Sequence, residues 1–347
     1  MPGEQQQDAH RQQFVLAEPV ALVLEQREPG QQVGQGVARR RAIGCRGKYL
    51  RLPVNLIAGK RSFRRAELLR DGTSPEGFVY IPEGPYLAGS DPVSKVTSWP
   101  RKERWVSGYW IARTEVTVAE YLEFVNDEDA RDVLEDIREG ERTRTFSRIP
   151  RDFIVDRPAR ATCRALWTTN NGRYETEWDH ERPITDISCE DADAYCQWRT
   201  ARSRRHGEPW LFRLPTEDEW EKAARGVDGR ACPWGDQLEP HFCKSDHSHD
   251  LDGIAQEVFQ RIIFEPVLRF TRDESPFGVS DTAGNALELC VGEPGEGIAF
   301  RRPWRGGFAL GAAATDLLSA SRHGGYPDRV GQNDGFRVVA WRRLPPH

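Results

Sequence analysis

Three capping boxes mark the starts of three helices in the central part of the chain. In a capping box, a Ser or Thr is followed three residues later by an acidic residue or a glutamine, and each side chain satisfies a backbone N–H near the other. The pairs are Thr117 with Glu120, Ser188 with Asp191, and Thr216 with Glu219. Apolar residues follow each pair at helical spacing, so each helix is expected to bury one face. The third helix is expected to end at Gly226, a residue that tolerates the left-handed turn after a helix.

Short segments rich in aromatic and β-branched residues surround these helix starts. They are typical of short strands, and they read FVYIP, GYWIARTEVT, PITDIS, WLFRLP, RPWRGGF and GFRVVAW. Charged insertions interrupt them at 126–182 and 241–274, and the first contains an Asn-Asn-Gly turn that predicts a hairpin. We therefore expect one compact α+β domain over 76–342. Three tryptophans are expected to be largely buried in it: Trp110, Trp220 and Trp234.

The first part of the chain has a different composition. Residues 1–44 are rich in Gln, Arg and Gly and contain a single aromatic residue, Phe14. Such a segment buries too little apolar surface to offset the entropy of ordering, so it is predicted to be a disordered tail. Over 45–75 the apolar residues alternate roughly around a turn at 58–60, which predicts a β-hairpin connector.

Composition and charge exclude several classes of partner. The net charge is −5 and the isoelectric point is near 6.0, so nucleic acid is not an expected partner, because phosphate binding needs a basic face. Apolar stretches are too short to span a bilayer, so no membrane partner is expected either. Seven cysteines occur without CxxC spacing, which favours reduced thiols and a cytoplasmic location.

Four segments together resemble a known family. They are RLPTEDEWEKAARG from Arg213, SPFGVSDTAGNALEL from Ser275, WRGGF from Trp304 and GFRVV from Gly335. In this order and spacing they resemble the formylglycine-generating enzyme family, also called the sulfatase-modifying factor domain. The resemblance implies a C-type-lectin-like mixed α+β fold with much irregular loop. The stretch before the domain resembles the connector of bacterial Ser/Thr kinase fusions, which implies a linkage to a kinase, although this chain has no kinase motifs.

Active members of that family carry two cysteines shortly after the Arg-Gly-Gly, where the pair holds Cu(I) and uses O₂ to oxidise a sulfatase cysteine. Counted from Arg305, these places fall at Gly311 and Asp316, and no cysteine follows Cys290. Copper is not expected, because soft Cu(I) prefers thiolates. The resemblance places a binding groove in this region, and its candidate residues are Arg305, Gly311, Asp316, Arg322, His323 and Asn333.

Three functions follow from these observations. The first is a catalytically inactive recognition module for an unknown protein or small-molecule ligand, with the small and polar segment 308–333 as its binding surface. The second is a formylglycine-generating oxidase with a relocated metal site. The third is the variable protein of a diversity-generating retroelement, since such proteins use this fold and vary this segment.

The Asp281–Glu288 segment predicts a cation site. A tight Gly284-Asn285 turn lets two carboxylates and the carbonyls between them converge, as Ca²⁺ requires. The resemblance implies the same site, with side chains of Asp281 and Glu288 and carbonyls of Gly284 and Ala286. The alternative is that the two acids cap the turn and pair with arginines. A second calcium site of the family is expected to be lost, because Lys244 stands in place of an asparagine.

Other cysteines and histidines are weaker candidates. Cys189 and Cys196 lie on one helix face and are expected to pack in the core, and Cys290 has no partner that would make it a nucleophile. The run at 247–250, with acids beside it, has atoms suited to zinc but is expected to be solvated. His323 has no orienting carboxylate that the sequence identifies.

Overall fold

The computed structural model describes in full residues 74–90, 98–127, 179–248, 264–293, 302–309, 314–324 and 333–343, and it assigns some strands outside these ranges. The chain divides into two units, Met1–Ser74 and Pro75–His347. Within the described residues, no helix is long and apolar enough to cross a membrane.

In the first unit the structure assigns an inner pair of strands that is close in sequence and an outer pair that is far apart. They are β1 (Val20–Leu24), β2 (Gly36–Arg41), β3 (Tyr49–Val54) and β4 (Ser62–Ala66). β1 pairs with β4 and β2 pairs with β3, both antiparallel. This arrangement differs from the expected hairpin over 45–75, and two of the strands fall inside the segment expected to be a disordered tail. Alternation predicts that a segment is a strand, but it does not say which strand is its partner.

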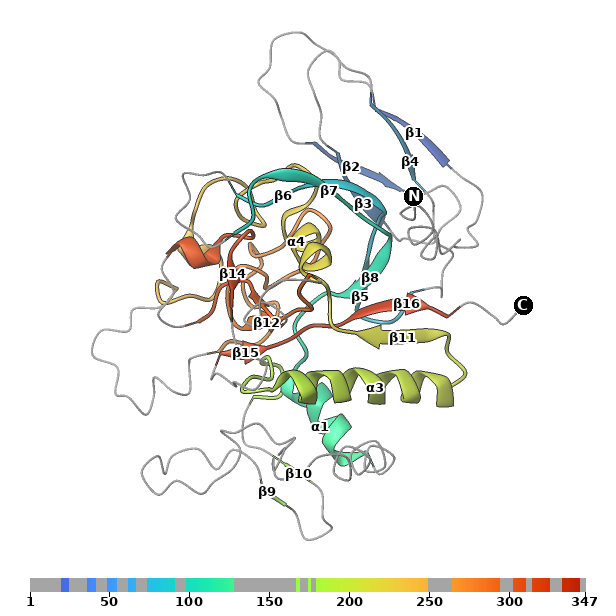
Figure 1. Ribbon diagram of the computed structural model, residues 1–347, viewed down its shortest axis with the longest axis vertical. Helices are drawn as coiled ribbons and strands as arrows, with labels where there is room; N and C mark the ends of the chain where they lie inside the picture. Colours follow the sequence, from blue (N-terminus) through green and yellow to red (C-terminus); the bar gives the residue numbers. More distant parts are fainter. Residues whose placement is uncertain are drawn as a thin grey trace, which may run out of the picture. The chain divides into compact units, whose positions relative to one another are not determined.

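The second unit is built on an antiparallel sheet of order β11-β16-β8-β5 (Figure 1). Its strands are β5 (Phe78–Ile81), β8 (Tyr109–Ala112), β11 (Trp210–Arg213) and β16 (Val339–Arg342). A two-stranded ribbon joins β6 (Gly84–Ala88) to β7 (Lys102–Val106). The predicted hairpin is confirmed in its strands, β9 (Trp167–Thr168) and β10 (Tyr174–Glu175).

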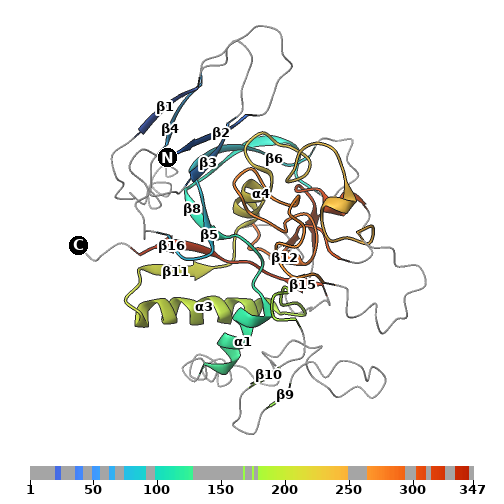
Figure 2. The same ribbon diagram turned by 180° about the vertical axis from the view of Figure 1, so that it is seen from behind.

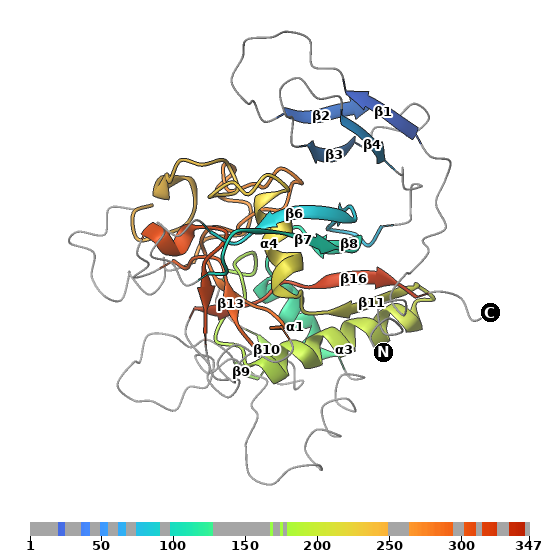
Figure 3. The same cartoon turned by 45° about the horizontal axis from the view of Figure 1, so that its top comes forward.

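All three predicted helix starts are confirmed, with both hydrogen bonds of each capping box present. The helices are α1 (Val118–Asn126), α3 (Cys189–Arg205) and α4 (Glu217–Arg225). α4 ends at Gly226 as predicted, with a φ of +82° that favours glycine. α3 packs along β11 (Figures 1 and 2), whereas α4 contacts both the β6–β7 ribbon and the small sheet that contains β13 (Trp304–Arg305) (Figure 3).

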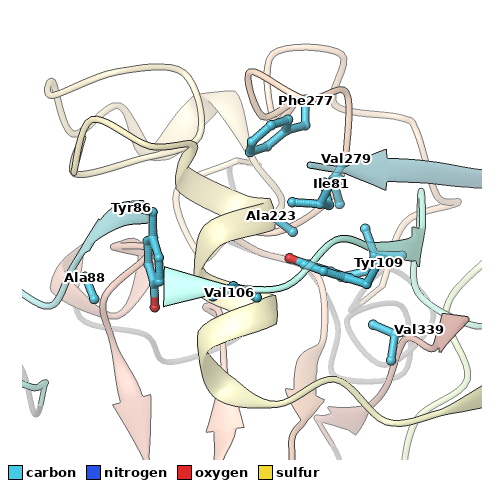
Figure 4. Close-up of a cluster of buried hydrophobic side chains, with 10 residues drawn as sticks. Ile81, Tyr86, Ala88, Val106, Tyr109, Ala223, Phe277, Val279 and Val339 are labelled. Atoms are coloured by element: carbon cyan, nitrogen blue, oxygen red, sulfur yellow. The ribbon is translucent and has the colours of Figure 1, made fainter. Parts of the chain in front are cut away.

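The core has two main parts. One joins the large sheet, the ribbon and α4, and its members include Ile81, Tyr86, Tyr109, Ala223 and Val339 (Figure 4). The other is a group of aromatic rings between α1, α3 and the C-terminal segment, namely Tyr121, Phe124, Tyr195, Trp198 and Phe336. Together they fix α4 and the strands that follow it.

Burial confirms two of the three tryptophan predictions. Trp110 and Trp220 are buried, but Trp234 is only half-buried, and its Nε1 donates to the Gln237 carbonyl. Cys189 and Cys196 are buried in the core as expected, and burial raises the pKa of both thiols.

Candidate functional site

The candidate residues gather on a second, smaller sheet of order β14-β13-β12-β15. Its strands are β12 (Leu287–Leu289), β13 (Trp304–Arg305), β14 (Arg322–His323) and β15 (Asp334–Gly335). Glu288 pairs with Arg305 and Arg305 with Arg322, while Leu289 pairs with Trp304 and Trp304 with His323. Because directly opposed residues share a face and neighbours along a strand alternate, the two rows lie on opposite faces.

The first row is charged and is held by α4. The Arg305 side chain is fully buried, and its Nη2 donates to Glu221 at 2.8 Å and to the Ser319 carbonyl at 3.0 Å. Arg322 donates from Nε and Nη2 to Glu217, with both distances 2.6 Å. Both guanidinium groups thus bond to carboxylates of α4, although Nε and Nη1 of Arg305, which solvent does not reach, have no hydrogen-bond partner. Of the predicted groove residues, Arg305 and Arg322 therefore serve the packing of α4 on the sheet.

Arg322 also stacks on an aromatic ring that the sequence reasoning missed. Its guanidinium carbon lies 4.0 Å from the centroid of the Trp99 ring, and that of Arg104 lies 3.9 Å from the same ring. Such cation–π contacts are favourable when the arginine is partly desolvated. Trp99 follows a segment without regular periodicity, so the sequence carried no signal for its partners.

Glu288, at the end of the predicted cation turn, is paired with an arginine. Arg337 is fully buried and donates from Nη2 to Glu288 Oε1 at 2.7 Å and from Nε to Oε2. Trp220 Nε1 donates to the same Oε2 at 2.8 Å. The Arg337 guanidinium reaches further to the carbonyls of Ser280 and Asp281. Both oxygens of Glu288 are therefore engaged, as the arginine-pairing alternative expects.

The same arginine faces more acid than it can neutralise. Asp281 accepts from the Leu268 N–H at 2.7 Å, and Asp273 accepts from the N–H groups of Thr282 and Ala283. Burial raises the pKa of Asp273 to about 7 and that of Asp281 to about 6. Glu115 is buried, neither of its carboxylate oxygens has a hydrogen-bond partner, and burial raises its pKa strongly. We call these three acids with Glu288 and Arg337 the acid cluster.

The acid cluster fits the predicted Ca²⁺ only in part. Among the residues described, no group of three or more His, Cys, Asp or Glu side chains is arranged to hold a metal ion. The predicted site has two carboxylates and two backbone carbonyls, which is fewer acidic side chains than such a group contains. The Glu288 carboxylate is occupied by Arg337, which does not fit direct ligation, whereas the excess of acid favours a cation. Calcium at Asp281, Gly284, Ala286 and Glu288 stays a prediction.

The second row of the small sheet is neutral. Trp304 is buried, and no hydrogen-bond partner is found for its Nε1. His323 is half-buried, and its Nε2, which solvent does not reach, also has no partner. Burial lowers the pKa of His323, while nearby Asp316 and a hydrogen bond to the Gly306 backbone oppose this effect. Trp304 was not identified from the sequence, although alternation in RPWRGGF places its side chain on the other face of the strand from that of Arg305.

The remaining groove candidates are Asp316, Asn333 and Gly311. Asp316 lies on a 3₁₀ turn, Ala314–Leu317, near enough to His323 to influence its charge. Its influence on His323 is electrostatic, because the hydrogen bond of the ring goes to the Gly306 backbone. The carbonyl of Asn333 accepts from the Leu287 N–H at 2.9 Å, which places this residue at the β12 edge. Gly311 lies outside the described residues.

Lys244 and the histidine run lie in the insertion 241–274, and the loss of a second calcium site at Lys244 stays a prediction. The Lys244 backbone carbonyl packs on the cation turn and accepts from the Asn285 N–H at 2.9 Å. A side chain at position 284 would meet this carbonyl at 2.2 Å, which explains Gly284. His247 is exposed, as a solvated loop predicts, and residues 249–250 and Asp252 lie outside the described residues.

The model of the sulfatase-modifying factor enzyme 1-like domain matches residues 65–342, and the chain belongs to this family. The predicted fold class, mixed α+β of the C-type-lectin-like kind with much irregular loop, is confirmed. The relatives include the inactive C-alpha-formylglycine-generating enzyme 2 of Bos taurus, 28% identical over 297 residues, which cover 77% of this chain and 89% of that protein. They also include the formylglycine-generating enzyme of Streptomyces coelicolor, 28% identical over 50% of this chain and 58% of that protein.

Solved structures with a similar course of the chain include Treponema denticola variable protein 1, at 18% identity and a TM-score of 0.48, covering 76% of this chain and 94% of that one. PvdO from Pseudomonas aeruginosa is 20% identical, with a TM-score of 0.47, and covers 77% of this chain and 94% of that one.

Proposed function

We propose that this chain is a non-catalytic member of its family that recognises a protein or small-molecule ligand and does not convert cysteine to formylglycine. The observation that carries the proposal is chemical. Positions 311 and 316 are glycine and aspartate, and no cysteine follows Cys290. Oxygen activation on Cu(I) in this family needs two thiolates, and neither residue supplies one.

The remaining cysteines do not replace the missing pair. The five described cysteines are all buried, and burial raises the pKa of each thiol. A buried thiol with a raised pKa is a poor metal ligand and nucleophile at neutral pH. A relative that aligns with three-quarters of this chain is itself described as inactive, which supports the same conclusion.

The recognition surface belongs to the same proposal. It comprises the segment 308–333, which follows Arg-Gly-Gly and includes the half-buried His323 of the neutral row. A kinase linkage and a cytoplasmic location are further parts of the proposal, and they rest on the connector resemblance and the reduced thiols.

The two alternative functions, an oxidase and a retroelement variable protein, require different observations. The first requires turnover, and the second requires a near-repeat of the DNA for residues 305–338 beside a reverse-transcriptase gene.

Turnover is the direct test. The full chain is incubated with Cu(I), O₂ and a peptide that carries a Cys-x-Pro-x-Arg motif, and the peptide is read by mass spectrometry. We expect no aldehyde above the no-protein sample, while an active family member in parallel converts the peptide. Aldehyde formation by this chain would overturn the proposal and support the oxidase.

A further inference from the structure

Trp304 and His323 are direct partners across β13 and β14. The two strands are antiparallel, and the register places Trp304 opposite His323. Opposed residues in such a pair have Cβ atoms about 4.5–5.5 Å apart and project from the same face. Trp304 Nε1 and His323 Nε2 both lack a hydrogen-bond partner and are shielded from solvent. Buried polar atoms without partners are rare in native proteins and call for an explanation.

The hydrogen bond at Gly306 defines which nitrogen of His323 carries the proton. Since Nε2 has no partner, the ring must use Nδ1 to bond the Gly306 backbone. This bond raises the pKa of the imidazole, so Nδ1–H donates to the carbonyl. Burial has the larger effect and lowers the pKa, which keeps the ring neutral at pH 7. Neutral imidazole protonated on Nδ1 presents Nε2 as an acceptor.

The pair therefore offers one donor and one acceptor on the same face. Indole Nε1–H is a donor only, and the Nε2 lone pair is an acceptor only. A carboxylate has no proton for Nε2 and would be repelled by nearby Asp316, while a cation has no acceptor for the indole. The pair has apolar neighbours besides Asp316, since Leu289 is buried beside Trp304 and the Phe308 ring lies 6.3 Å from that of His323. A neutral group with both an acceptor and a donor fits.

We propose that Trp304 and His323 form an amide-recognition pair, in which the indole N–H donates to an amide oxygen and His323 Nε2 accepts from an amide N–H. The proposal rests on the proposed recognition function and names the chemistry that the surface takes. Peptide main chain and the carboxamide of Asn or Gln share this chemistry.

Amide titration of the full chain with ¹⁵N-labelled tryptophan tests the pair. The probes are N-acetylglycine N-methylamide for the peptide main chain, propionamide for the carboxamide, and acetate as the charged comparison. We expect the Trp304 indole resonance, assigned from its loss in Trp304→Phe, to shift saturably with at least one amide and not with acetate. Which amide gives the tighter saturation distinguishes the two sources.

Matched variants separate the pair from general effects. In His323→Phe, amide binding read at the Trp304 indole should weaken about tenfold, the effect of one hydrogen bond of ordinary net strength. His323→Gln keeps an acceptor and should keep most of the affinity. Binding read at the His323 ring should weaken similarly in Trp304→Phe. Trp105→Phe removes an indole that is 65% exposed on β7 and should change nothing.

The outcomes are distinct from those of the turnover test. Failure of both amides to saturate, an equal response to acetate, or an indole proton that contacts only a long-lived water would overturn the pair. None of these results would restore formylglycine formation. Aldehyde formation in the turnover test would overturn the proposed function, but it would not change the result of the amide titration.

Discussion

The two rows of the small sheet differ in how their polar atoms are satisfied. In the charged row, Glu288, Arg305 and Arg322 are held by Arg337, Glu221 and Glu217 through short hydrogen bonds. The neutral row consists of Leu289, Trp304 and His323, and its Trp304 Nε1 and His323 Nε2 have no hydrogen-bond partner. In the charged row, Nε and Nη1 of Arg305 also have none, although Nη1 lies at ion-pair distance, 3.7 Å, from Glu217. Each row takes one residue from each of the adjacent pairs 288–289, 304–305 and 322–323. The unpaired nitrogens of the charged row belong to a guanidinium that Glu221 already holds, whereas the indole N–H of Trp304 is the only polar group of its side chain.

Breaking the charged row should have the largest effect. Arg337→Met removes the partner of Glu288 and leaves an excess of buried acid beside Glu115. We expect the free energy of unfolding in urea at pH 7 to fall by about 3–5 kcal/mol, as when one member of a buried ion pair is removed.

The control for this variant is Arg202→Met, since the Arg202 side chain is 40% exposed and its ion-pair partner Glu123 is 59% exposed. Such surface pairs contribute about 0–1 kcal/mol. If Arg337→Met cost no more than Arg202→Met, the acid cluster would have another source of neutralisation.

A pair of tryptophan variants compares the rows directly. Trp220→Phe and Trp304→Phe remove the same atoms from buried sites, but only Trp220 Nε1 donates to a carboxylate. We expect Trp220→Phe to cost about 1.5–3 kcal/mol more in urea unfolding, the value of a hydrogen bond to a charged group. Equal costs would mean that the Trp304 indole has a partner in solution and would remove the contrast between the rows.

Short-range features were predictable because their partners lie within a few residues. Each capping box, the Asn-Asn-Gly hairpin and the end of α4 at Gly226 follows from local sequence. The partner of Glu288 was not predictable, since Arg337 lies 49 residues further along the chain and the sequence offers many arginines. The pairing of β1 with β4 was missed for the same reason, because alternation is the same whichever strand is the partner.

The candidate site was predictable as a region but not as two faces. Arg305 was identified from its motif, and Arg322 and His323 were candidates because they lie in the segment near the expected groove. The register of β13 and β14 sends the arginines to α4 and His323 to the other side. Trp304 lies in the WRGGF segment but was not named as a site candidate, because its place on the face of His323 depends on this register. Asp316 became the acid near His323 only through the turn at Ala314–Leu317.

Calcium removal tests whether Arg337 alone balances the acid cluster. If Ca²⁺ binds through Asp281 and the turn carbonyls, a chelator should lower the melting temperature. At free Ca²⁺ about tenfold above Kd, the loss corresponds to about 1.4 kcal/mol. The Asp281→Ala variant should melt lower and no longer respond to chelator, while Glu293→Ala, an exposed acid, should respond like the parent. An unchanged melting temperature in the parent would show that the turn is stabilised by arginine pairing.

The smallest expected effect is a pH dependence from the neutral row. Burial lowers the pKa of His323 below its usual 6.5, so in the folded protein the ring loses its proton at a lower pH than in the unfolded chain. Between these two values the unfolded state binds more protons, and the stability contributed by His323 rises with pH and is lost as pH falls. The difference in unfolding free energy between the parent and His323→Gln should therefore grow from pH 5 to 7. His241→Gln, at an exposed site, is the control and should show no such trend. A difference that instead shrank with rising pH would mean that His323 is stabilised in its charged form beside Asp316, and the pair with Trp304 would then present two donors and no acceptor.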